Sequence, residues 1–220
     1  SGGTTWAQLI GINSLQTMTE GQLSVISVAD NGDVLSPIEH YITPAYNDLR
    51  RIFPDMPDLT VVAMSLASDS ITQWQVYPAT RESLYLFIDP RDLAFLSTGE
   101  QNVYMSVGAP LIKSFFGGRD NQLTENIAYF LWVHYLTGGD AEAMRPLLED
   151  GLPTGNIVFY SSVPFAERYQ LANALFDTYV SAGETATFDL LRVMRTQIDA
   201  LSTLPIENLN TWIAERLNAH

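Results

Sequence analysis

The sequence predicts an α+β fold, with a mixed β-sheet in its amino-terminal half packed on a buried central helix and a helical carboxy-terminal half. Three observations predict it. Residues 22–107 contain five short segments with the composition or alternation of β-strands. Residues 121–137 read as a helix that is apolar on nearly every side, which is typical of a helix at the centre of a domain. Residues 164–217 repeat apolar residues at steps of three and four, as helices do.

The expected strands follow from local patterns. Residues 4–20 show no firm periodicity and are expected to be a short helix or a loop. The turn-forming triplet Asn31-Gly32-Asp33 predicts that the first strand pairs with a strand beginning at residue 34. Pro44 opens a helix at its first turn, and Pro54 helps to end it. The predicted strands cover residues 22–29, 59–66, 71–77, 83–88 and 102–107.

The expected helices are bounded by glycine and proline. The central helix stops at Gly138-Gly139, and a second short helix runs to about Asp150. Three more helices are expected over residues 164–182, 185–201 and from Pro205 to 217. Because no linker or repeat interrupts the pattern, the sequence predicts a single domain over residues 4–220, with a sheet-bearing half (4–120) and a helical half (121–220).

The composition is acidic and free of cysteine. The formal net charge is −14, from 25 acidic and 11 basic residues, and Lys113 is the one lysine. Such a chain repels phosphate backbones, so we expect neither a nucleic acid nor an anionic membrane as partner. The lack of cysteine excludes disulfides and thiolate metal sites, and the sequence contains no apolar run of the length that spans a bilayer.

The order of elements resembles that of zincin metallopeptidases of the peptidase MA-like (gluzincin) type, which carry H-E-x-x-H on a helix that follows a sheet. Residues 147–152 (LLEDGL) resemble the W-L-x-E-G-L element of that family, and residues 209–212 (LNTW) resemble its closing tryptophan segment. The resemblance implies a zincin-like fold and an extracytoplasmic protein that is secreted, periplasmic or lipid-anchored. Ser1-Gly2-Gly3 has the look of a cloning remnant, so a signal peptide or anchor could precede it in the natural protein.

The zincin motif itself is degenerate. With His134 aligned to the second histidine, Phe130 replaces the first and Leu131 replaces the catalytic glutamate. In the other register, Tyr135 replaces the glutamate and Gly138 the second histidine. Asp150 stands where the third ligand, a glutamate, is expected. His134 and Asp150 are therefore the only remnant metal ligands that the resemblance offers, and neither register supplies a general base for a zinc-bound water.

Each candidate residue also has an ordinary structural interpretation. A lone histidine on an apolar helix is typical of a core residue bonded to a carbonyl or hydroxyl, and Asp150 is typical of a helix C-terminal turn. Four aromatic residues also have two interpretations: they could line a peptide-binding cleft between sheet and helix, or they could form an aromatic core. These residues are Trp74, Tyr129, Trp132 and Tyr135.

Three functions compete at this stage. The first is a non-catalytic zincin-like domain, a pseudoenzyme that binds a protein or peptide or serves as a scaffold, with no catalytic residues and no cofactor. The second is a metal-dependent hydrolase or peptidase with an atypical ligand set, for example zinc held by Asp120, Glu125 and His134. The third is a domain unrelated to zincins, which would be recognised by a central helix that does not pack under the sheet.

Overall fold

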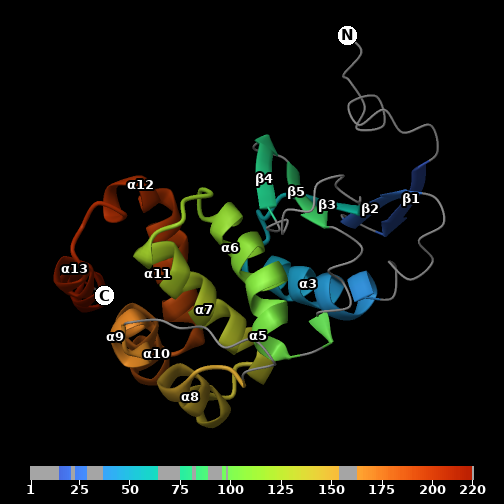
Figure 1. Ribbon diagram of the computed structural model, residues 1–220. Helices are drawn as coiled ribbons and strands as arrows, with labels where there is room; N and C mark the ends of the chain where they lie inside the picture. The colour runs from blue at the N-terminus through green and yellow to red at the C-terminus, as the bar shows by residue number, and fades with distance from the viewer. Residues whose placement is uncertain are drawn as a thin grey trace.

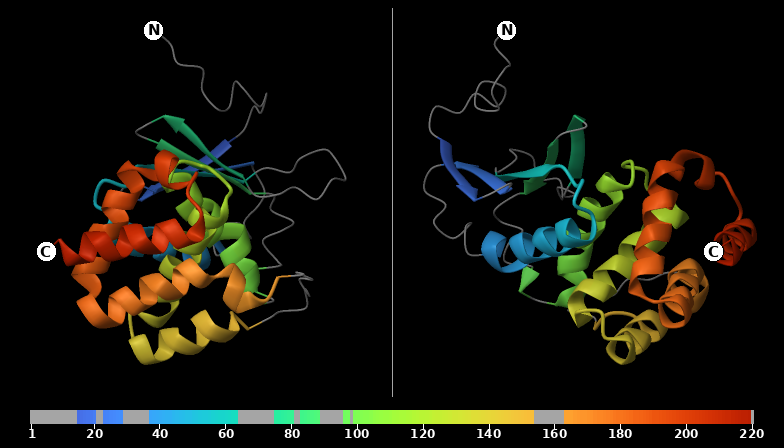
Figure 2. Two further views of the ribbon diagram at one scale, coloured as in Figure 1. Left: turned by 90° about the vertical axis from the view of Figure 1, so that its left-hand side faces the viewer. Right: turned by 180° about the vertical axis from the view of Figure 1, so that it is seen from behind.

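The computed structural model describes residues 15–20, 23–28, 37–63, 75–80, 83–88, 96–97, 99–153 and 163–219. Within the strands it describes side chains at positions 58–62, 84 and 86. The described chain is mostly helical, so the predicted α+β class is wrong. The strands form a small layer at one side of a larger helical body, and the last helices of the chain lie on the far side (Figures 1 and 2).

The strand layer has the order β1-β2-β3-β5-β4. Strand β2 pairs parallel with β3, and β3 pairs parallel with β5, while β1 and β4 are antiparallel edge strands. The antiparallel partner of β2 is β1, which lies within residues 4–20, where the sequence predicted a helix or loop. The expected partner at residue 34 lies outside the described residues. The strands are β1 (Leu15–Glu20), β2 (Leu23–Val28), β3 (Asp58–Ala63), β4 (Gln75–Thr80) and β5 (Ser83–Ile88).

Helices make up most of the remaining described chain, and two of the segments, η1 and η3, are π-helical. They are η1 (Ile38–Ile42), α3 (Thr43–Ile52), α5 (Glu100–Val103), η3 (Tyr104–Gly108), α6 (Ala109–Phe115), α7 (Gln122–Thr137), α8 (Ala141–Asp150), α9 (Phe165–Arg168), α10 (Gln170–Ala182), α11 (Glu184–Thr196), α12 (Ile198–Leu201) and α13 (Ile206–Asn218). None of the described helices has the length and apolar character needed to cross a bilayer.

The predicted strand over residues 102–107 is wrong, because these residues belong to the continuous helical run α5-η3-α6. Val103, Met105 and Val107 alternate with more polar residues, which suggested a strand with a period of two. Val103, Val107 and Leu111 also follow one another at steps of four, so these three residues share one helical face. That face is buried. The helical spacing of these residues therefore agrees with the observed structure, and their alternation does not.

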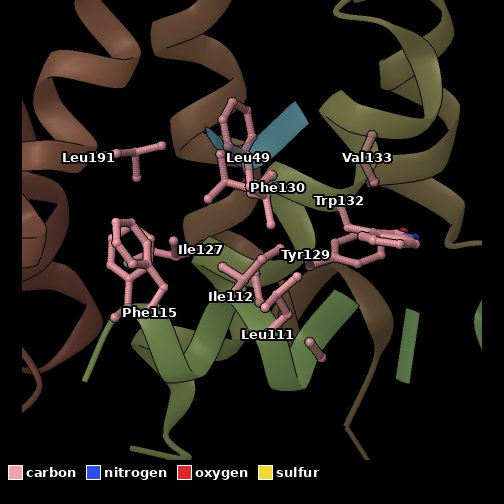
Figure 3. Close-up of a cluster of buried hydrophobic side chains, with 14 of the residues drawn as sticks. Leu49, Leu111, Ile112, Phe115, Ile127, Tyr129, Phe130, Trp132, Val133 and Leu191 are labelled. Atoms are coloured by element: carbon pink, nitrogen blue, oxygen red, sulfur yellow. The ribbon is translucent and has the colours of Figure 1, made fainter. Parts of the chain in front are cut away.

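Helix α7 packs between α6 and α10, not under the strands as predicted. Helix α6 contacts α7 as well as β4 and β5, so it connects the strand layer to the central helix. Ile127 and Phe130 of α7 lie among Leu111, Ile112 and Phe115 of α6 in the apolar cluster that Figure 3 shows. The central helix is thus buried by other helices.

One contact between η3 and α7 depends on a missing side chain. A Cβ atom at Gly108 would lie 2.4 Å from Cε3 of Trp132, which is far inside van der Waals contact. Trp132 is 1% exposed, so the indole is enclosed by neighbouring groups. Glycine at position 108 therefore allows the largest side chain of α7 to pack directly on a neighbouring helix backbone.

The ends of α7 are set by local chemistry. Asn121 is the N-cap: its side chain accepts from Thr124 N at 3.0 Å, and the Thr124 hydroxyl accepts from Asn121 N at 3.3 Å, which completes a capping box. At the other end, the amide of Gly139 donates to the carbonyl of His134 at 3.0 Å, and Gly138 has a φ of 62°. This left-handed turn is the C-terminal stop that the two glycines predicted.

Helix α11 attaches to two other helices through its arginines. Arg192 donates to the carbonyl of Ile52 at the end of α3, and Arg195 Nε donates to the carbonyl of Phe115 at the end of α6, at 2.9 Å. The Arg195 guanidinium carbon also lies 3.7 Å from the centre of the Phe115 ring. These cations lie against carbonyls that have no partner within their own helices, so they cap both C-termini from outside.

Candidate functional site

His134 lies in the last turns of α7 with 1% of its surface exposed, and its partner is a carboxylate. Its Nε2 atom lies 3.2 Å from Oε2 of Glu184, the first residue of α11. The imidazole also makes edge contacts with the rings of Tyr179 and Phe188, whose centres lie 5.7 and 5.0 Å away. His134 is thus a core histidine, as the structural interpretation expected, although a carboxylate takes the place of a carbonyl or hydroxyl.

Tyr179 and Gly139 complete this group, which we call the His134 cluster (His134, Gly139, Tyr179 and Glu184). The Tyr179 hydroxyl lies 2.6 Å from the Gly139 carbonyl oxygen and 3.2 Å from Glu184 Oε2, so two acceptors share its proton. A Cβ atom at Gly139 would lie 2.9 Å from both His134 Nε2 and the Tyr179 hydroxyl. The glycine therefore lets the backbone close over the ends of both side chains.

The electrostatics of the cluster favour an ionised Glu184 and a neutral Tyr179. Partial burial opposes ionisation of Glu184, but hydrogen bonds and charge from His134, together with the Tyr179 hydroxyl, outweigh it and lower the pKa of the carboxyl. Burial, with Glu184 nearby, raises the pKa of Tyr179 to about 12. Because an ionised carboxylate only accepts, His134 Nε2 is the donor of their hydrogen bond.

The other ring nitrogen of His134 is Nδ1. This atom is buried and has no hydrogen-bond partner within the described part of the chain. Either ring nitrogen of a histidine can bind zinc, and in His134 the Nε2 atom is already bonded to Glu184. The side chains of the His134 cluster are therefore an imidazole, one carboxylate and a phenol, and they join α7, α10 and α11.

Asp150 forms no part of the His134 cluster. It is exposed at the end of α8, and the next residue, Gly151, has a φ of 92°. This placement agrees with the interpretation of Asp150 as a helix C-terminal turn residue. Among the described residues, no group of three histidine, aspartate or glutamate side chains is placed to hold a metal ion. Phe130 and Leu131, which replace the zincin histidine and glutamate in the preferred register, are fully buried.

The atypical ligand set is dispersed over three separate contacts. Asp120 accepts from Lys113 Nζ at 2.8 Å, and His134 belongs to its own cluster. Glu125 accepts from Arg168 Nε at 2.9 Å and from the Tyr169 hydroxyl at 3.2 Å. Each side chain is engaged with a different partner, so these three residues do not form one metal site.

Asn126 is a buried polar residue that sequence reasoning missed. Its side-chain nitrogen donates to the carbonyls of Gln122 at 2.7 Å and Arg168 at 3.0 Å, and its oxygen accepts from Ala172 N at 3.0 Å. Ala172 lies in the first turn of α10, a helix without a side-chain cap of its own. Asn126 therefore caps α10 from α7, across a sequence distance that no local motif reveals.

Two of the four expected cleft aromatics lie in the core. Tyr129 is 2% exposed and Trp132 is 1% exposed, whereas Tyr135 is half-buried and Trp74 lies outside the described residues. The Tyr129 ring lies 4.4 Å from that of Tyr169, centre to centre, and its hydroxyl donates to the carbonyl of Leu147. This arrangement supports the aromatic-core interpretation for Tyr129 and Trp132.

The described basic side chains are all engaged within the chain. Each forms an ion pair with a carboxylate or lies over an aromatic ring. They are Arg50, Arg51, Lys113, Arg119, Arg145, Arg168, Arg192, Arg195 and Arg216. The described surface therefore presents an excess of carboxylates and no cluster of uncommitted cations.

The chain matches no protein-family model, no curated protein and no solved structure. The zincin resemblance consequently stays a prediction from the sequence. The functional argument below starts from the geometry of the His134 cluster.

Proposed function

We propose that this protein is a non-catalytic domain that acts as a binding or scaffold module. The observation that carries the proposal is the His134 cluster. The histidine that the zincin resemblance singled out is buried, and its Nε2 atom bonds to Glu184, which links α7 to α11. Because this imidazole is buried and its Nε2 atom is bonded to Glu184, the proposal assigns it a role in the stability of the domain and not in the activation of water.

Hydrolysis through a bound metal is the competing function. A catalytic zinc requires three protein ligands, an open position for water and a carboxylate to take the proton of that water. In the described part of the chain, Asp120, Glu125 and His134 belong to separate contacts. A metal site would therefore have to recruit ligands from residues outside the described ranges, and this is the alternative that experiment must address.

The partner that fits best is a protein or peptide. The formal charge is −14, and each described Lys or Arg either pairs with a carboxylate or lies over an aromatic ring. A surface of this kind repels nucleic acid and anionic lipid and is compatible with neutral or basic polypeptides. An extracytoplasmic location belongs to the same proposal, and fractionation of cells that express the natural gene tests it directly.

The proposal does not depend on the zincin resemblance. A zincin requires its central helix to pack under the sheet, whereas α7 packs between α6 and α10. This packing supports the alternative in which the resemblance in element order arose by chance. A binding or scaffold role is compatible with either relationship.

The experiment is a metal analysis combined with a cleavage assay. Protein purified without chelator is assayed for bound zinc, and its activity on a mixed peptide library is measured with and without EDTA. We expect substoichiometric zinc and no cleavage under either condition. Stoichiometric zinc together with cleavage that EDTA abolishes would overturn the proposal in favour of the hydrolase.

A further inference from the structure

We draw no further inference here: the strongest candidate, the buried polar atoms without hydrogen-bond partners on α3, α5 and α7 (Asp48 Oδ2, Gln101 Oε1 and Trp132 Nε1), carries no proposal because nothing in the described part of the chain shows what occupies the space beside them.

Discussion

Oε2 of Glu184 lies 3.2 Å from Nε2 of His134, and the pair joins the start of α11 to the end of α7 across 50 residues of sequence. The imidazole is buried, while the carboxylate is 45% exposed. One partner therefore resides in the core and the other reaches the surface. Because the carboxylate is accessible to solvent, the contact can be tested by changing the pH and by substituting Glu184.

Replacement of Glu184 by glutamine should lower the free energy of unfolding at neutral pH by up to about 1 kcal/mol, because the carboxylate is half exposed and partly screened by solvent. The folded-state pKa of Glu184 is lowered below its ordinary value of 4.5. Its stabilising contribution is therefore complete above about pH 4.5 and is lost as the pH falls through the folded-state pKa. Urea unfolding of wild type and Glu184→Gln at several pH values measures the difference.

The matched control for this pair is Glu215→Gln, which alters an exposed carboxylate on α13. It should unfold like wild type at every pH. A difference between wild type and Glu184→Gln that persists unchanged at pH 3 would show that ionisation of Glu184 is not what stabilises the contact.

Tyr179 should make the free energy of unfolding depend on pH above about pH 10. Its pKa is raised to about 12 in the folded protein, from an ordinary value of 10.0. The folded state therefore holds its proton more tightly, and the resulting stabilisation is present below pH 10 and declines as the pH rises towards 12. Tyr179→Phe should lose less stability than wild type over this alkaline range. Equal losses in the two proteins would contradict the assignment.

Gly108→Ala should destabilise the domain by about 1–3 kcal/mol, the usual cost of overpacking a core. The added Cβ would lie 2.4 Å from the Trp132 ring. The substitution should cost much less in a Trp132→Leu background, because the smaller side chain leaves room for the new methyl group. Urea unfolding of the four proteins gives the coupling free energy. Strictly additive effects would show that the two residues do not press on each other.

Asn126→Asp should lower the free energy of unfolding by about 1–3 kcal/mol, because the aspartate cannot donate to the carbonyls of Gln122 and Arg168. The side chain keeps its size, so packing is little changed. Asn210→Asp, an exposed change on α13, is the control and should have a small effect. Equal effects of the two substitutions on thermal unfolding would be evidence against a capping role for Asn126.

Local chemistry predicted several elements closely. Asn121 and the Gly138-Gly139 pair set the ends of α7 where the sequence placed them, and the segment predicted at residues 83–88 has the bounds of β5. These boundaries depend on residues next to one another in the chain. Capping groups, left-handed glycines and short runs rich in aromatic and aliphatic residues are all readable at that range.

The fold class was wrong because short patterns are ambiguous and packing is not local. Residues 102–107 fit both an alternating strand and the helical face that continues to Leu111. The single helix expected over 164–182 is divided at Tyr169, and the new start of α10 is capped by Asn126. Likewise, nothing near His134 in the sequence indicated Glu184 as its partner. Such contacts between distant residues are decided by tertiary structure.

The account depends most on the claim that His134 is a structural residue, and zinc-dependent stability tests it most directly. A zinc ion held at about 100 times its dissociation constant would stabilise the folded protein by about 2.7 kcal/mol. We predict that the free energy of unfolding of the wild-type protein is the same in excess zinc and in EDTA. Stabilisation by zinc that disappears in both His134→Gln and Asp150→Asn would contradict the account and establish a metal site at these residues.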